Sequence, residues 1–153
     1  MPDKVAMLIE NIGLVLGEIK KSNGFFNDVK KIDYGVTSYD NNSFSNEEYP
    51  RIQIICNNIS IPEFTTTDSK VQVELTINGY LRKKKDVETD LGSYQESVNW
   101  SNDLRKGVAN WLKQIPEEID GDLIDNQIQQ TIGFPLTLLT CTTEFGIIFE
   151  ECY

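Results

Sequence analysis

The segment spanning residues 70–81 constrains the fold more than any other part of the sequence. Four aliphatic side chains alternate there with polar ones: Val71, Val73, Leu75 and Ile77. Because successive side chains of a strand point to opposite faces, this pattern predicts a strand with one apolar face and one polar face. An apolar sheet face needs a cover, and amphipathic helices are a common one.

Two segments have the periodicity of amphipathic helices and are the candidate covers. In residues 3–21 apolar side chains recur at helical spacing, and Asp3 is a candidate N-cap. The second predicted helix spans residues 97–114, and its Gly107 would permit close approach to the sheet. Its apolar side carries Val98, Leu104, Val108, Trp111 and Leu112.

Most other segments have strand character, so the sheet is predicted to be large. The predicted strands, besides the central one, are residues 29–36, 51–56, 128–132, 136–141 and 144–150. Residues 57–69 contain Pro62, which interrupts a central ladder, so we expect this segment to leave the sheet. Asn78-Gly79 predicts a bulge or a turn. We predict a single α+β domain over residues 1–153, with a mainly antiparallel sheet and two helices packed on one face.

The composition excludes several kinds of chemistry. The 153 residues include no histidine, which excludes most hydrolase triads and most catalytic zinc sites. Cys56, Cys141 and Cys152 are too widely spaced for a disulfide framework or a zinc pair, and are interpreted as structural thiols. The acidic residues 117–125 lack the spacing of a calcium loop, and no phosphate-binding loop is present. We therefore predict a protein that is not an enzyme, with no catalytic residues, cofactor or metal.

The absence of long apolar runs and of a signal-peptide pattern predicts a chain made in a cytoplasm, with no membrane partner. The net charge is −10, from 14 basic and 24 acidic residues, which disfavours binding to nucleic acid. Binding and assembly remain, since exposed strand edges and hairpins often pair with neighbouring chains.

Two groups of residues form the candidate assembly interface. The first is Ile59, Ile61 and Phe64, apolar residues in an irregular segment that needs a cover. The alternative for these residues is that they fold onto their own core. The second is the basic cluster Arg82, Lys83, Lys84 and Lys85, which is either a docking site for an acidic partner or a solvated hairpin end neutralised by Asp86, Glu88 and Asp90.

The order and spacing of these segments resemble the tail terminator, or tail completion, proteins of long-tailed bacteriophages. The resemblance covers nearly the whole chain, although no single piece is diagnostic. The matching segments are Gly24-Phe25-Phe26-Asn27-Asp28-Val29, Tyr49-Pro50-Arg51-Ile52-Gln53-Ile54, the alternating strand 71–81, Asp103-Leu104-Arg105-Lys106-Gly107-Val108 and the closing strand 145–149.

This resemblance implies a structural virion protein at the head-tail interface. Its partners would be itself as a ring, typically of six copies, the tail tube protein and a neck or connector protein. Such a ring would stop tube polymerisation and join the tail to the head, and DNA would pass through it without specific binding. The alternatives are another phage tail, neck or connector subunit, or a small monomeric ligand-binding module or enzyme.

Overall fold

The computed structural model describes residues 4–35, 46–64, 68–82, 91–115, 122–123, 128–133 and 138–152. These residues form two α-helices, two short 3-10 helices and a six-stranded sheet. The α-helices are α1 (Lys4–Leu16) and α2 (Leu91–Lys113), and the 3-10 helices are η1 (Lys21–Asn23) and η2 (Asn46–Glu48). The strands are β1 (Lys31–Tyr34), β2 (Arg51–Phe64), β3 (Asp68–Arg82), β4 (Asp122–Leu123), β5 (Gln129–Gly133) and β6 (Leu138–Cys152).

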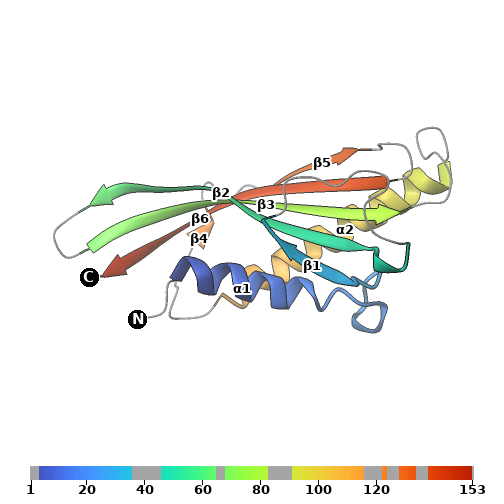
Figure 1. Cartoon of the computed structure of the whole chain (residues 1–153), viewed down its shortest axis with the longest axis horizontal. Helices are drawn as coiled ribbons and strands as arrows, with labels where there is room; N and C mark the ends of the chain where they lie inside the picture. The colour runs from blue at the N-terminus through green and yellow to red at the C-terminus, as the bar shows by residue number, and fades with distance from the viewer. Residues whose placement is uncertain are drawn as a thin grey trace.

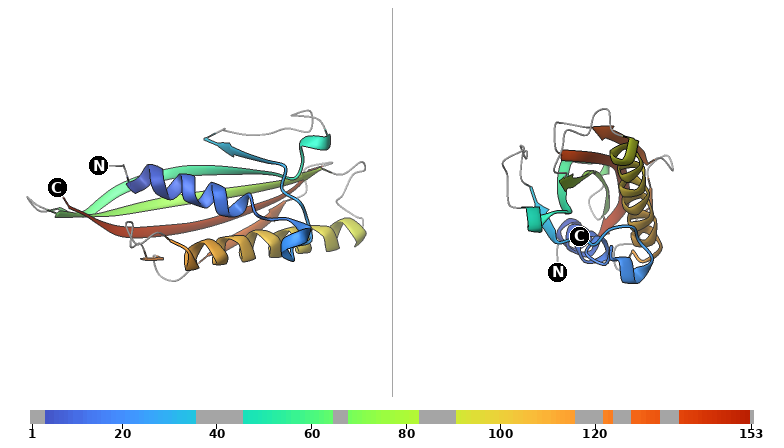
Figure 2. Two further views of the ribbon diagram at one scale, coloured as in Figure 1. Left: turned by 90° about the horizontal axis from the view of Figure 1, so that it is seen from below. Right: turned by 90° about the vertical axis from the view of Figure 1, so that its right-hand side faces the viewer.

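The sheet has the strand order β1-β2-β3-β6-β4, and β5 also pairs with β6 (Figure 1). Among the described strands, only the β1–β2 pair is parallel. The central strand β3 pairs with β6 along its whole length, from Asp68 opposite Cys152 to Arg82 opposite Leu138. The two α-helices lie side by side under one face of this sheet (Figure 2). The predicted α+β fold, with a mainly antiparallel sheet, is confirmed.

The predicted apolar face of β3 is the centre of the core, since its four aliphatic side chains are at most 3% exposed. Their buried neighbours on the same face of the sheet are Ile52, Ile54, Cys141, Phe145, Ile147 and Phe149. The helices contribute Leu8, Ile12, Leu16, Trp100, Leu104, Val108 and Trp111. Trp111 is the core residue that the sequence predicts, with its ring centroid 5.6 Å from that of Phe145. Fully burying one large aliphatic side chain contributes about 1.5–3 kcal/mol, so this layer supplies most of the stability.

Both helices are predicted correctly in place but not in length. α1 ends at Leu16 rather than at residue 21, because Gly17 follows and the chain tightens into turns, with Glu18 N donating to Val15 O at 3.1 Å. α2 begins at Leu91, six residues before the predicted start at Ser97. Val98, predicted on the apolar side of α2, is 38% exposed. The buried side of the helix contains Ser97 and Ser101 instead, in line with Leu104 and Val108.

Two glycines mark close approaches between elements, and neither acts as predicted. Gly79 is no bulge or turn: it pairs in register with Ile52 and Cys141, and a Cβ added to it would lie 2.4 Å from Leu104 Cδ1 of α2. Gly107 of α2 faces the end of α1 rather than the sheet, since a Cβ there would lie 2.9 Å from Leu16 Cδ2. Both positions need the small residue for packing.

The segment 57–69 does not leave the sheet as expected; β2 continues through it to Phe64 and pairs with β3. A bulge between Cys56 and Asn58 inserts one extra residue, so Cys56 opposes Leu75 and Ile59 opposes Val73. This shift moves the apolar face of β2 from even to odd positions. A second irregularity between Ser60 and Glu63 accommodates Pro62, which is compatible with a bulge on an edge strand.

Two further predictions about strands need correction. Of the first predicted strand, residues 29–36, the described part contains only the four residues of β1, which pair with β2, and Val36 lies outside the described residues. The described parts of the two predicted strands 136–141 and 144–150 are one continuous strand, β6, because β3 offers it an unbroken partner, and residues 136–137 lie outside the described residues. The predicted strand at residues 128–132 corresponds to β5. Lys83, Lys84, Lys85 and most of the acidic segment 117–125 lie outside the described residues.

Candidate assembly interface

The ends of β2, β3 and β6 continue together past the start of α1 (Figure 1). We call the half of the sheet that leads to these ends the arm and define it as residues 57–64, 68–74 and 146–152. Within it the core residues Val71, Val73, Ile147 and Phe149 are buried, and β4 pairs with β6. A view from below shows the same strands running beyond the first residues of α1 (Figure 2). The Lys4 ammonium donates a hydrogen bond to the backbone oxygen of Glu150 at 2.9 Å, which ties the start of α1 to the arm.

The outer edge of β2 is open along the arm. β1 pairs with β2 only as far as Ile54, whose carbonyl accepts a last hydrogen bond from Gly35 N at 3.0 Å. Within the described part of the chain, no strand pairs with this edge beyond that point. A row of backbone groups at an unpaired edge is a template for pairing with another chain.

Ile59 and Ile61 lie on this open edge and are 52% and 50% exposed. Ile59 shares the apolar face of the sheet with Val73, its partner in β3, which is fully buried. Phe64 ends β2 and pairs through its backbone with Ser69. The structure therefore brings two of the predicted interface residues together at one edge, with neighbours on one side only.

Arg82 lies at the other end of β3 and does not join this group. It is nine residues beyond Val73, the partner of Ile59, which is about 30 Å along an extended strand. Its guanidinium lies over the ring of Tyr49, with Cζ 4.8 Å from the ring centroid. Arg82 is therefore at the opposite end of the sheet from Ile59 and Ile61, so these three residues do not form one continuous contact.

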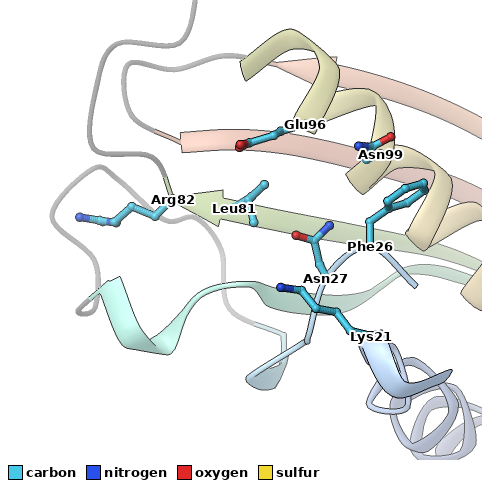
Figure 3. Close-up of a pocket in the computed structure, with 7 residues that line it drawn as sticks. All are labelled: Lys21, Phe26, Asn27, Leu81, Arg82, Glu96 and Asn99. Carbon is cyan, nitrogen blue, oxygen red and sulfur yellow. The ribbon is translucent and has the colours of Figure 1, made fainter. Parts of the chain in front are cut away.

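A polar hollow of about 310 Å³ lies beside Arg82 (Figure 3). Its lining is Lys21, Phe26, Asn27, Leu81, Arg82, Glu96 and Asn99. Both signs of charge and two side-chain amides are present, which suits hydrogen bonding to a small polar molecule. The volume is at the lower end of the range for ligand pockets, and the Arg82 guanidinium points away from Asn27.

A buried carboxylate positions the turn that borders this hollow. Asp103 of α2 is 1% exposed, and its two oxygens accept hydrogen bonds from the backbone N–H groups of Phe26 and Asn27, each at 2.9 Å. The side-chain amide of Asn27 donates to the same carboxylate at 3.0 Å. The turn also requires Gly24, whose φ of +88° favours glycine. The sequence offers no spacing that links residues so far apart, so this contact was not predicted.

The side chain of Phe26 is 57% exposed although its backbone is held by the buried Asp103. It borders both the polar hollow and a second, larger hollow of about 550 Å³. The lining of the larger one is Phe26, Asn102, Arg105, Lys106 and Ala109, and we call it the α2 hollow. Lys106 packs with its ammonium 5.5 Å from the centroid of the Phe25 ring. A rigidly held, exposed aromatic beside a hollow is typical of a protein contact.

Burial raises the pKa of the thiol of Cys141 above its usual range, although hydrogen bonds from Ser101 and Thr143 and the charge of Arg105 lower it. Burial also raises the pKa of the Cys56 thiol, against a smaller opposing effect of the hydrogen bond with Asn58. The thiols of Cys56 and Cys141 therefore keep their protons at neutral pH, in keeping with the interpretation as structural thiols. None of the helices in the described residues is both long and apolar enough to cross a membrane.

No protein-family model matches the sequence, and no curated protein gives a significant match. The resemblance to tail terminator proteins therefore stays a prediction from order and spacing. The surfaces that carry an inference about function are the open edge of β2, the polar hollow and the α2 hollow.

Proposed function

We propose that this chain is a structural virion protein of the tail terminator type, which closes into a ring on the end of a phage tail tube. The ring would stop tube polymerisation and offer a surface to a neck or connector protein, without catalysis. The observation that carries the proposal is the open edge of β2 in the arm, along which Ile59 and Ile61 are half-exposed.

The open edge supports assembly for two reasons. A partner packed against this edge would cover the two isoleucines, and hydrogen-bonding groups of that partner would satisfy the outward backbone groups of β2. Burying the exposed half of an isoleucine contributes about 1 kcal/mol, so the pair alone contributes about 2 kcal/mol before backbone pairing is counted. This free energy is modest for one contact. It suits a ring subunit, because such a subunit is held by contacts with several neighbours at once.

The charge of the chain supports a role beside passing DNA. With a net charge of −10, a ring of several copies would have a strongly negative field. A negative lumen repels the phosphate backbone, so DNA would slide through without being retained. This part of the proposal predicts that duplex DNA passes without retention through a column that carries the immobilised ring, at about 0.15 M salt.

The test is the native mass of the purified protein over a range of concentrations, with negative-stain images of each species. We expect a closed ring of about six copies, as cyclic closure is what a tube cap requires. Adding the ring to polymerising tail tube protein should then arrest tube growth. A protein that stays monomeric at every concentration, and has no effect on tube length, would overturn the proposal.

The polar hollow of about 310 Å³ favours a second candidate, a monomeric ligand-binding module. Its Lys21, Glu96 and Asn99 side chains could bind a small polar molecule that carries both charges. A ligand screen by thermal shift separates the two candidates. A saturable shift that Glu96→Gln abolishes, in a protein that does not assemble, would favour the module.

A further inference from the structure

The α2 hollow is the described surface with the strongest features of a docking site. One wall of the α2 hollow is the ring of Phe26. The backbone of this residue is held by the hydrogen bond to Asp103 and by the turn that Gly24 permits. The volume of the hollow, about 550 Å³, is sufficient for two or three aliphatic side chains. Preorganisation of this kind lowers the entropy cost of binding a partner.

The charge of the α2 hollow is opposite to that of the chain as a whole. Among its lining residues Arg105 and Lys106 are basic and exposed, and none is acidic. The chain has a net charge of −10, so a basic surface on it is a specific feature. An occupant that is apolar and acidic would match it.

The arm has these two properties. Its three segments carry five acidic residues and one lysine, and its open edge carries Ile59 and Ile61. The acidic residues are Glu63, Asp68, Glu74, Glu150 and Glu151. Glu74 and Glu150 pair with Asn58 and Lys70 and therefore point to the face opposite Ile59. The arm of one copy thus complements the α2 hollow of another in polarity at Ile59 and in net charge across the thickness of the sheet.

The positions of the two surfaces also suit a ring. Phe26 shares the polar hollow with Leu81 and Arg82 at the end of β3 that is remote from the arm. Apart from Phe26, the lining residues of the α2 hollow lie in the middle of α2, so the arm and the α2 hollow are separate surfaces of the molecule. A contact between two different surfaces repeats head to tail and closes into a ring when the rotation allows it, whereas a contact of one surface with itself stops at a dimer.

We propose that the α2 hollow receives the open edge of the arm of a second copy of this chain, with Ile59 or Ile61 against Phe26, and that the net negative charge of the arm favours its approach to Arg105 and Lys106. This inference rests on the proposed function, because it names the two surfaces that meet in the ring. It assigns the contact to the hollow rather than to a strand of the neighbouring sheet.

The test uses two variants that each break one side of the contact. Ile61→Lys puts a positive charge and a polar group on the arm, and Phe26→Ser combined with Arg105→Glu removes the wall and reverses one charge in the hollow. The matched controls are Thr131→Lys on the exposed face of β5 and Lys113→Glu, the same kind of charge change on α2 outside the hollow. All proteins are compared by sedimentation, with circular dichroism melting to show that they are folded.

We expect each variant to weaken self-association at least tenfold, while both controls assemble as the unmodified protein does. We further expect an equimolar mixture of the two variants to form a dimer and nothing larger. The arm variant still has an intact hollow and the hollow variant an intact arm, so one contact can form in the mixture. If the hollow variant fails to fold, Arg105→Glu alone is measured against Lys113→Glu.

The other outcomes separate this inference from the proposed function. Rings that form normally with the hollow variant would overturn the inference, leave assembly standing and assign the hollow to the tube or neck protein, or to no partner. Two variants that each fail to assemble, and that also fail to pair in the mixture, would show that arm and hollow do not touch each other. An unmodified protein that remains monomeric at all concentrations would overturn both.

Discussion

β2 passes through two different environments along its length. In the first, which we call the body, Ile52 and Ile54 are 0% and 2% exposed, because β1 and β3 flank the strand and the helices cover its face. In the arm, Ile59 lies on the same face as Val73 and is 52% exposed, and Ile61 farther along the same strand is 50% exposed. All four residues are isoleucines, so the difference comes from their neighbours. The body completes its own core, whereas the arm leaves part of its apolar face for a partner.

The largest expected effect contrasts one core residue of the body with one residue of the arm. Trp111→Ala should lower the free energy of unfolding by about 4 kcal/mol, because it leaves a large cavity against Phe145. Ile61→Ala should lower it by less than about 1 kcal/mol, because the side chain is half-exposed in the monomer. Urea denaturation at a concentration below assembly measures both. Equal losses would show that the arm belongs to the core.

The next effect concerns the ion pair that fastens β1 to β2 in the body. Arg51 donates to both carboxylate oxygens of Asp33, from Nε and Nη2, each at 2.9 Å, and its side chain is 6% exposed. Asp33→Ala would leave a buried guanidinium without this partner and should cost about 3 kcal/mol. The control is Glu10→Ala on the exposed face of α1. A loss as small as that of the control in urea denaturation would show that solvent or Glu48 replaces the lost carboxylate.

A smaller effect is expected at the turn before β1. Asp103→Ala removes the acceptor for three donors and should cost about 2 kcal/mol. Asp103→Asn keeps one acceptor oxygen and should cost less. If Phe26 belongs to the assembly contact, Asp103→Ala should also weaken self-association under conditions in which the monomer remains fully folded. Sedimentation at a temperature well below melting checks this, and unchanged association would separate Phe26 from the ring contact.

The smallest effects are expected at two cysteines, Cys141 in the body and Cys56 where the open edge begins. The first is a pH dependence of stability that comes from Cys141. Burial raises the pKa of the Cys141 thiol, so the unfolded chain loses this proton at lower pH than the folded chain does. The stability contribution is present below the ordinary thiol range, about pH 8.5, and is lost as the pH rises through the raised pKa. The unmodified protein should therefore lose more stability than Cys141→Ala between pH 8 and pH 10, measured by urea denaturation.

The same two thiols should also differ in reactivity. Cys141 is 1% exposed, whereas Cys56 is partly exposed. In a background with Cys152 replaced by serine, a maleimide should label Cys56 well before Cys141. Equal labelling rates would indicate that the body opens as readily as the edge.

The sequence predicts the body better than the arm because the signals for the body are local. Strict alternation in residues 71–77 and helical periodicity in α1 and α2 each lie within one element. In the arm the alternation of β2 is interrupted by the bulge at Asn57, so the apolar positions change phase and resemble an irregular segment. Pro62 also argues against a strand in the sequence, but a proline at a bulge on a sheet edge is compatible with an intact strand.

The candidate site depends on contacts that leave no pattern in the sequence. Ile59 and Ile61 could be predicted as interface residues because apolar residues in an irregular segment need a cover. The hydrogen bonds from Phe26 and Asn27 to Asp103 could not be predicted, because the donors are backbone N–H groups, which every residue except proline has. The α2 hollow is likewise built from segments whose proximity comes from the packing of α1 and α2 under the sheet.

The full-length pairing of β3 with β6 has a consequence for the time course of folding. β2 and β3 are joined by a short connection and can form a hairpin early, whereas β6 must be brought from far along the chain. Contacts between distant segments form slowly, because loop closure is unfavourable until many of them form together. Until β6 has paired, the hairpin exposes the edge of β3 that β6 later covers, as well as the outer edge of β2. Newly made copies are therefore most exposed to mispairing in this interval, and slow, dilute refolding should give the highest yield of native subunits.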